Sequence, residues 1–310
     1  MLGALLATVL FSLSAVSASR TTRLMGGTEA NFWRLSLALG FLALFAHTLG
    51  GGLGGAAFHL FLISGCIGFG LGDVAFFQAL PRLGTRLSVL LVNCLAAPFA
   101  ALLEWLWLGT TLSGAEMLCA VVILCGVALA LAPGEHLHIE CRPFWLGLLA
   151  GALAALGQAS GAVWSRKAFE AVRLAGENMD GMTAAYQRLL GGVVIAGLCL
   201  LVVKRRWIVG HATSAAPDEE LDLPDARAKW RQAAPWMTMN ALAGPTLGVS
   251  CFQWALREKG TGVVLPIVAL TPLVVIPFTA WLEGERPGVR SLLGGLVAVA
   301  GAVALTLVSR

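Results

Sequence analysis

The segment "GFGLGDVAFFQAL", Gly68–Leu80, occurs a second time in this chain in altered form, and the pair decides the fold. It returns 176 positions later as "GPTLGVSCFQWAL", Gly244–Leu256, with six identical residues in register. Both copies lie in apolar runs long enough to cross a lipid bilayer. A segment that repeats at this separation indicates that the chain consists of two related halves.

The first copy also contains Gly-Leu-Gly-Asp, which is similar to the Gly-x-Gly-Asp signature of intramembrane aspartyl proteases. Such an enzyme needs two carboxylates that share one site, one ionised and one protonated. The residue equivalent to Asp73 is Val249, and every other aspartate of the chain lies in a polar segment. The sequence therefore argues against a protease, and we do not expect an enzyme.

The two copies share the spacing Gly-x-x-x-Gly, which occurs as Gly68 with Gly72 and as Gly244 with Gly248. Glycines four residues apart lie on one face of a helix and let a second helix approach closely. We therefore expect these four glycines to form a helix-packing seam in each half.

The composition is that of a membrane protein, because 58% of the residues are hydrophobic and only 12% are charged, whereas about a quarter are charged in soluble domains. Ten apolar runs of spanning length lie near 2–19, 32–50, 57–80, 86–108, 114–133, 143–163, 183–204, 234–255, 261–282 and 289–308. Five runs fall in each half, so the second half enters the membrane from the opposite side. The sequence predicts an all-α integral membrane fold with ten transmembrane helices in two inverted five-helix repeats.

The predicted boundaries follow from this repeat. The first five-helix repeat covers 1–133, a connecting loop covers 134–142, and the second repeat covers 143–310 with a polar loop at 205–232. Met1–Ala18 is similar to a signal peptide, but it has a counterpart inside the second half, so we expect it to form the first helix. Inverted repeats of this kind are typical of secondary transporters, which bind substrate near the midplane between the halves.

The C-terminal segment "LTPLVVIPFTAWLEGERPGVRSLLGGLVAVAGAVAL", Leu270–Leu305, resembles the EamA-type proteins of the drug/metabolite transporter superfamily. The pattern consists of a helix-nine proline, a Gly-Glu at the helix end and a glycine-rich tenth helix, here Pro272, Gly284, Glu285, Gly294 and Gly301. A weaker copy in the first half has Pro98, with Thr110 in place of the glutamate. The resemblance implies a transporter in the cell (inner) membrane with both termini in the cytoplasm. The distribution of Lys and Arg over the loops favours the opposite orientation.

Polar residues inside apolar runs are the candidate site, because a charged group at a helix centre costs roughly 2.5–3.5 kcal/mol and so faces a cavity or a partner. The candidate substrate-binding residues are Asp73, Asn93, Gln158, Trp164, Tyr186, Arg188, Asn240, Gln253 and Trp254. Contacts between helices would explain the amides equally well. Arg34 and Arg188 begin corresponding helices, where interfacial snorkelling is the ordinary interpretation. Arg188 is the stronger candidate, since a guanidinium suits a carboxylate or phosphate.

Metal and cofactor sites are not expected. The seven cysteines form no Cys-x-x-Cys pair, and His136-x-His138 within the loop segment Glu135–Cys141 is by itself weak evidence for a metal. No Gly-x-x-x-x-Gly-Lys phosphate loop is present, so ATP is not expected to drive the protein. Lys and Arg lie scattered at helix ends, which argues against nucleic-acid binding.

The leading hypothesis is a secondary transporter that exports a small polar metabolite, such as an amino acid or related compound. Its partners would be the substrate, the lipid bilayer, and a coupling ion or proton; a homodimer and a monomer both remain open. One alternative is efflux of amphipathic drugs or cations, which the ten tryptophans could accommodate through cation–π contacts. A second alternative, from another class, is a membrane scaffold or lipid-handling protein that transports nothing.

Overall fold

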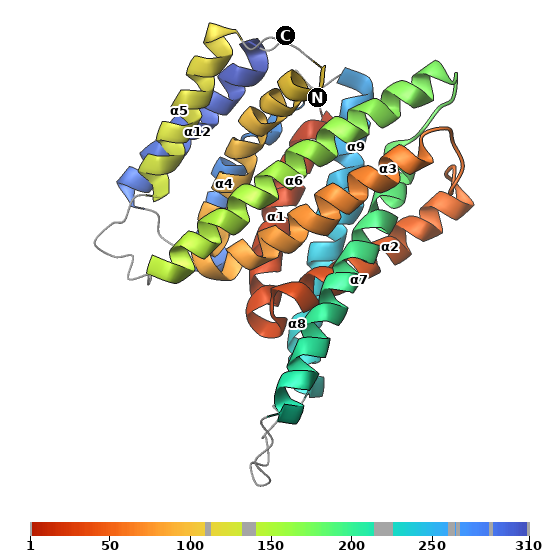
Figure 1. Ribbon diagram of the computed structural model, residues 1–310, viewed down its shortest axis with the longest axis vertical. Coiled ribbons are helices and arrows are strands. Elements are labelled where there is room, and N and C mark those ends of the chain that lie inside the picture. Colours follow the sequence, from red (N-terminus) through yellow and green to blue (C-terminus); the bar gives the residue numbers. More distant parts are fainter. Residues whose placement is uncertain are drawn as a thin grey trace.

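The computed structural model describes residues 2–108, 113–131, 141–213, 226–259, 264, 267–284 and 288–308. Within this part of the chain the regular elements are all helices (Figure 1). They are α1 (Leu2–Met25), α2 (Gly27–Thr48), α3 (Phe58–Gly65), η1 (Cys66–Gly72), α4 (Asp73–Leu108), α5 (Gly114–Leu131), α6 (Cys141–Leu174), α7 (Gly181–Thr213), α8 (Ala226–Ala241), η2 (Leu242–Gly248), α9 (Val249–Lys259), α11 (Thr271–Leu282) and α12 (Val289–Val308).

Four helical segments are long and apolar enough to cross a membrane: Leu2–Met25, Phe58–Ala100, Arg142–Leu174 and Gly181–Arg205. Three shorter apolar helices, in α5, α11 and α12, have 10–17 residues within the described chain. A transmembrane helix needs about 20 apolar residues. The chain is therefore a multi-pass helical membrane protein.

The segment from α3 to α4 contains two predicted spans, 57–80 and 86–108, and the backbone breaks where they meet. Gly84 has φ 78° and ψ 168°, which interrupts the helical geometry inside α4. Glycine adopts positive φ without a steric penalty because it has no Cβ atom. The boundary between the two runs is thus a change of direction at a single glycine.

Each half contains a seven-residue π-helix at the same place in the repeat. Residues Cys66–Gly72 form η1 and Leu242–Gly248 form η2, so the two elements are separated by the same 176 positions as the sequence repeat. π-helical segments are rare and occur frequently at functional sites. The two halves therefore share an unusual local backbone as well as a sequence motif.

Each π-helix packs against the first two helices of the other half. Element η1 lies against α6 and α7, and η2 lies against α1 and α2. A Cβ atom on Gly161 would lie 3.1 Å from the Cα of Gly68, and one on Gly72 would lie 3.3 Å from the Cα of Gly157. Glycine on both sides brings η1 and α6 into backbone contact.

The second seam is less symmetric. A Cβ atom on Gly248 would lie 2.8 Å from the ring of Phe11, and one on Gly244 would meet the hydroxyl of Ser14. All four predicted seam glycines thus lie at contacts between the halves. Glycines of α6 lie opposite the pair in η1, whereas side chains of α1 lie opposite the pair in η2.

Two features lie at the edge of the bundle. Helices α5 and α12 pack side by side on one flank, and α7 extends beyond the other helices (Figure 1). With 33 residues, α7 is about 50 Å long, which exceeds the roughly 30 Å hydrocarbon core. Both ends of the predicted polar loop 205–232 are helical, because α7 continues to Thr213 and α8 begins at Ala226; residues 214–225 lie outside the described part.

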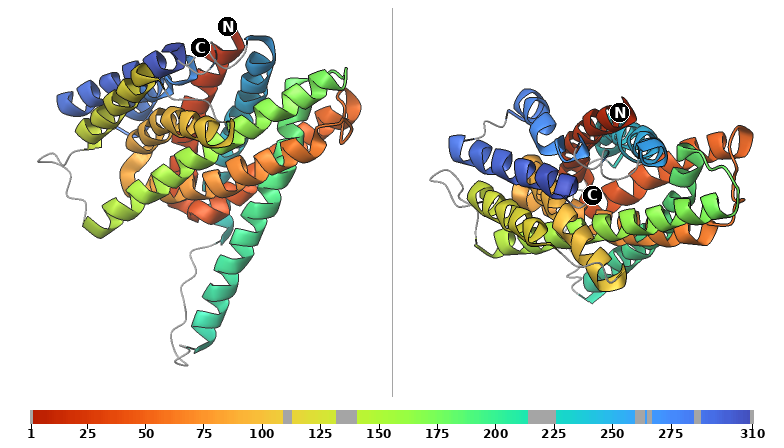
Figure 2. Two further views of the ribbon diagram at one scale, coloured as in Figure 1. Left: turned by 45° about the horizontal axis from the view of Figure 1, so that its top comes forward. Right: turned by 90° about the horizontal axis from the view of Figure 1, so that it is seen from above.

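The beginning of α1 and the end of α12 lie at the same end of the molecule (Figure 2). The predicted His136-x-His138 pair and residues 134–140 of the predicted connecting loop 134–142 lie outside the described residues, and the last two residues of that loop, Cys141 and Arg142, begin α6.

Candidate functional site: a central cavity with two arginines

A cavity of about 200 Å³ lies where the two halves meet. Helices α1, α2, α4, α6, α7, α9 and both π-helices contribute to its lining. The charged and amide side chains of the lining are Arg34, Asp73, Asn93, Gln158 and Arg188. Its aromatic side chains are Phe11, Phe69, Phe76 and Phe252. The cavity therefore combines a few polar groups with an apolar wall, as small-molecule sites do.

Arg34 and Asp73 form a buried ion pair in the first half. The Nη2 atom of Arg34 donates to Oδ2 of Asp73, and Nε donates to Oδ1 of Asn31 at 3.1 Å. The guanidinium also lies 4.7 Å from the ring centre of Phe77. Arg34 and Asp73 are each only 5% exposed. A buried ion pair is tolerated when further hydrogen bonds satisfy its members, and Asn31 supplies one.

Arg188 occupies the equivalent position in the second half but is not paired in the same way. It is 5% exposed, and within the described residues it makes neither an ion pair nor a hydrogen bond. Its Nε atom is buried without a partner, and the guanidinium lies 5.0 Å from the ring centre of Phe69. Asp73 interacts with it electrostatically but bonds to Arg34 instead. Among the described residues, the ionisable side chains of the lining are two arginines and one aspartate, which carry a net charge of +1.

The two arginines are placed reciprocally. A Cβ atom on Gly244 would lie 3.3 Å from Nη1 of Arg34, and one on Gly68 would lie 3.3 Å from Nη2 of Arg188. Each guanidinium thus lies against the π-helix of the other half, at the first glycine of the repeated motif. The glycines leave room for the arginine side chains as well as for the seams.

Four of the predicted site residues line the cavity: Asp73, Asn93, Gln158 and Arg188. The amide nitrogen of Asn93 donates to the carbonyl of Val89 at 2.9 Å, so its oxygen and its second N–H remain for a ligand. Gln158 lies on α6, in the part of the cavity wall that the second half contributes.

The other five predicted residues do not line this cavity. The hydroxyl of Tyr186 hydrogen-bonds Nε2 of His47 at 3.0 Å, and Oδ1 of Asn240 accepts from Ser14 at 2.7 Å. Gln253 is fully buried with neither amide atom hydrogen-bonded. Trp164 is half-buried on α6, and Trp254 is 39% exposed.

The snorkelling interpretation of the two arginines is wrong, because both are buried in the cavity wall rather than extended to an interface. Arg34 lines the cavity although the sequence suggested an interfacial position for it, and the four phenylalanines are lining residues that the sequence did not single out. The repeat could have indicated some of these lining residues, because Arg34 corresponds to Arg188 and Phe76 corresponds to Phe252.

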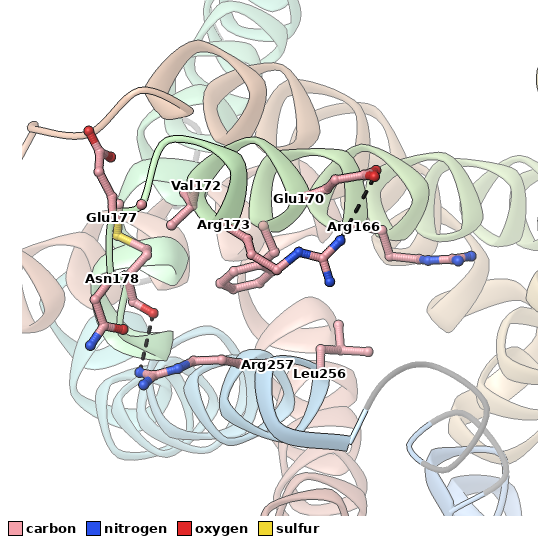
Figure 3. Close-up of a pocket in the computed structure, with 11 residues that line it drawn as sticks. Arg166, Glu170, Val172, Arg173, Glu177, Asn178, Leu256 and Arg257 are labelled. Atoms are coloured by element: carbon pink, nitrogen blue, oxygen red, sulfur yellow. Dashed lines mark hydrogen bonds and ion pairs between the residues drawn. The ribbon is translucent and has the colours of Figure 1, made fainter.

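A second cavity, of about 640 Å³, lies near the end of α6 beside α9 (Figure 3). Its arginines are engaged by neighbours: Arg173 lies 3.9 Å from Glu170, and Arg257 donates to the carbonyl of Met179 at 3.4 Å. The Arg173 and Glu170 side chains are 78% and 60% exposed, so water screens their charges. The central cavity, which contains a buried cation without a bonded partner, is therefore the stronger candidate.

The fold and this cavity define a multi-pass helical membrane protein with a polar chamber between two related halves. The sequence matches the EamA-like transporter family over residues 1–132 and 145–307. The chain belongs to this family and hence to the drug/metabolite transporter superfamily. Members of the family are membrane transporters rather than enzymes.

Two further comparisons complete these findings. The chain is similar to a protein of known crystal structure, with a TM-score of 0.54 and 16% sequence identity over 98% of this chain and 97% of the other. At that identity the likeness supports the fold alone. No curated protein matches the sequence.

Proposed function

We propose that this protein is a secondary transporter that carries a small polar metabolite through the central cavity. The observation that carries the proposal is the buried guanidinium of Arg188 in the cavity wall, without an ion pair in the described chain. A charge inside a membrane protein is expensive and marks a substrate or ion path by default. Family membership supplies the class of activity, and the cavity supplies a place for it.

The mechanism we propose is alternating access by two inverted five-helix repeats, 1–133 and 143–310. The paired π-helices and their packing against the opposite half support a pseudo-two-fold relation. The adjacent ends of α1 and α12 fit an even number of membrane crossings. Rocking of one half against the other would open the cavity to each side in turn.

The setting we propose is the cell (inner) membrane, with both termini in the cytoplasm and export as the direction. The substrate would be an amino acid or a related compound such as a carboxylic acid, and a coupling ion or proton would supply the driving force. A cysteine introduced near Lys204, at the far end of α7 from the glycine seam, tests the orientation by labelling from either side of the membrane.

The aromatic part of the lining favours a second candidate, efflux of amphipathic drugs. Four phenylalanines surround the cavity, and such a wall accepts flat apolar molecules. Its net positive charge opposes cationic drugs, so this candidate applies to neutral or anionic ones. The alternative of a scaffold or lipid-handling protein that transports nothing predicts instead that substitution of the polar cavity residues leaves function intact.

Counterflow uptake into proteoliposomes tests the proposal. Purified protein is offered a pool of amino acids, organic acids, sugars and cationic dyes, and mass spectrometry identifies what accumulates. We expect one chemical class to enter with the wild type and not with Arg188→Ala. Arg173→Ala, which removes an exposed arginine at the second cavity, is the matched control and should behave as the wild type. No uptake by folded wild-type protein would overturn the proposal.

A further inference from the structure

The two halves differ at one position that bears directly on the substrate. Asp73 follows η1 and Val249 follows η2, and the two residues are equivalent in the repeat. Arg34 and Arg188 are likewise equivalent. In the first half the arginine binds the carboxylate that follows the π-helix. In the second half the arginine has no such carboxylate, because the corresponding residue is valine.

Val249 occupies the position from which the equivalent carboxylate, Asp73, reaches its arginine in the first half. It lines the same cavity as Arg188 and is 7% exposed. It also belongs to the same buried cluster as Phe69 and Leu189. The ring of Phe69 contacts the Arg188 guanidinium, and Leu189 follows Arg188 in the chain. The second half therefore contains the cation and the space, but not the anion, of the ion pair found in the first.

Resting on the proposed function, we infer that the substrate is a small organic monoanion whose carboxylate binds Arg188 in the place that Asp73 occupies in the first half. A guanidinium binds a carboxylate through two parallel hydrogen bonds. Such a substrate brings the net charge of the lining from +1 to zero, which removes the cost of an uncompensated buried cation.

The charge count distinguishes this class from its neighbours. An amino acid zwitterion needs a second anionic group for its ammonium, and Asp73 is already bonded to Arg34. It would also leave the cavity at +1. A dianion would carry the cavity past neutrality to −1, and a cation would raise it to +2. A monoanion is the only one of these four classes that neutralises the site.

The cavity also limits the rest of the molecule. Phe11, Phe69, Phe76 and Phe252 line it, so the body of the substrate is apolar and suited to contact with aromatic rings. Its volume of about 200 Å³ is below the 300–1,000 Å³ of drug-sized pockets. We therefore expect a compact aryl or branched aliphatic carboxylic acid.

A matched series of four compounds tests the inference. Counterflow is measured with 3-phenylpropionate (monoanion), phenylalanine (zwitterion), phenylsuccinate (dianion) and phenethylamine (cation), which share one aromatic body. We expect 3-phenylpropionate to enter at least about tenfold faster than the others, since a neutralised buried pair differs from an uncompensated charge by more than the 1.4 kcal/mol that corresponds to tenfold.

Two substitutions at one position test where the carboxylate binds. Val249→Asp supplies an internal carboxylate, so it should lower 3-phenylpropionate uptake at least about tenfold relative to Val249→Asn, which has nearly the same shape without the charge. Equal uptake by the two variants would overturn the inference. Should Val249→Asp fail to fold, Asp73→Asn gives an independent answer: it frees Arg34, raises the cavity charge to +2, and should increase the ratio of phenylsuccinate to 3-phenylpropionate uptake. An unchanged ratio would contradict the charge count.

The outcomes separate this inference from the proposed function. Uptake of phenylalanine or phenethylamine in preference to 3-phenylpropionate leaves a transporter but overturns the monoanion. Absence of uptake for these four compounds and for the mixed pool overturns the proposed function itself.

Discussion

In the first half of the cavity the buried arginine is neutralised by an aspartate of the protein, whereas in the second half the buried arginine has no bonded carboxylate within the described residues. Arg34 has Asp73, Asn31 and the ring of Phe77 around it. Arg188 has the ring of Phe69 and a buried Nε atom without a partner. The backbone is nearly the same in both places, because each contains a π-helix with the same glycine spacing. We propose that the repeated backbone holds a structural ion pair in one copy and the substrate-binding arginine in the other, because the second copy has valine in place of aspartate.

The largest expected effect is the loss of transport when the arginine without a bonded carboxylate is replaced. Arg188→Ala should reduce counterflow of the substrate at least about 30-fold, because removal of one partner of a buried, hydrogen-bonded charge pair costs 2–5 kcal/mol or more. Arg188→Lys should retain part of the rate, since lysine keeps the charge but loses the two-pronged geometry. Initial uptake rates measure both, and a wild-type rate in Arg188→Ala would break the comparison.

The second prediction concerns stability without substrate, where the two arginines should behave oppositely. Arg34→Gln leaves Asp73 without its bonded partner and should lower the free energy of unfolding by about 3 kcal/mol, since breaking a buried pair costs 3–5 kcal/mol. Arg188→Gln removes an uncompensated buried cation and should leave stability equal or higher. Thermal unfolding in detergent gives the order of the melting temperatures. The reverse order would show that Arg188, not Arg34, holds the fold together.

The third prediction concerns the seam between η1 and α6. Gly157→Ala would place a methyl group 2.6 Å from the Cα of Gly72, where backbone and not a flexible side chain must move. We expect a loss of about 1–3 kcal/mol of stability, the usual cost of overpacking. Gly40→Ala in α2 is the control, because a Cβ atom there meets nothing within 4 Å, and it should be neutral or slightly stabilising. A neutral Gly157→Ala would argue against close packing in this seam.

The smallest expected effect concerns a predicted site residue that lies outside the cavity. Tyr186→Phe removes the hydrogen bond to His47, which should cost about 0.5–1.5 kcal/mol of stability. The ratio of uptake among the four phenyl compounds should stay unchanged, because Tyr186 does not line the chamber. A changed uptake ratio would indicate that Tyr186 contributes to the binding site.

The all-helical membrane class could be predicted from the sequence, because membrane-spanning helices are recognisable by their length and apolar composition. The π-helices could not, since their altered hydrogen-bond register leaves no periodic signature; Pro245, which lacks an N–H, is the one local hint. The break at Gly84 lies between two predicted runs, but the sequence alone does not indicate its positive φ.

The candidate site was predicted in part. Asp73 and Arg188 were found because charges in apolar runs stand out, whereas Asn240 and Gln253 were chosen for the same reason and lie outside the chamber. A helix that is apolar on every side gives no indication of which face borders a cavity. The pairing of Arg34 with Asp73 was missed as a specific contact, since it joins two helices whose relative position the sequence does not specify.

The most direct test of the central claim is the stability of Val249→Asp against Val249→Asn in the absence of substrate. If a carboxylate at this position reaches Arg188, the aspartate variant forms an internal ion pair and should melt at a higher temperature than the asparagine variant, and 3-phenylpropionate should stabilise the asparagine variant but not the aspartate variant. A lower melting temperature for Val249→Asp, with equal stabilisation of both variants by 3-phenylpropionate, would contradict the claim that the substrate carboxylate replaces the missing aspartate.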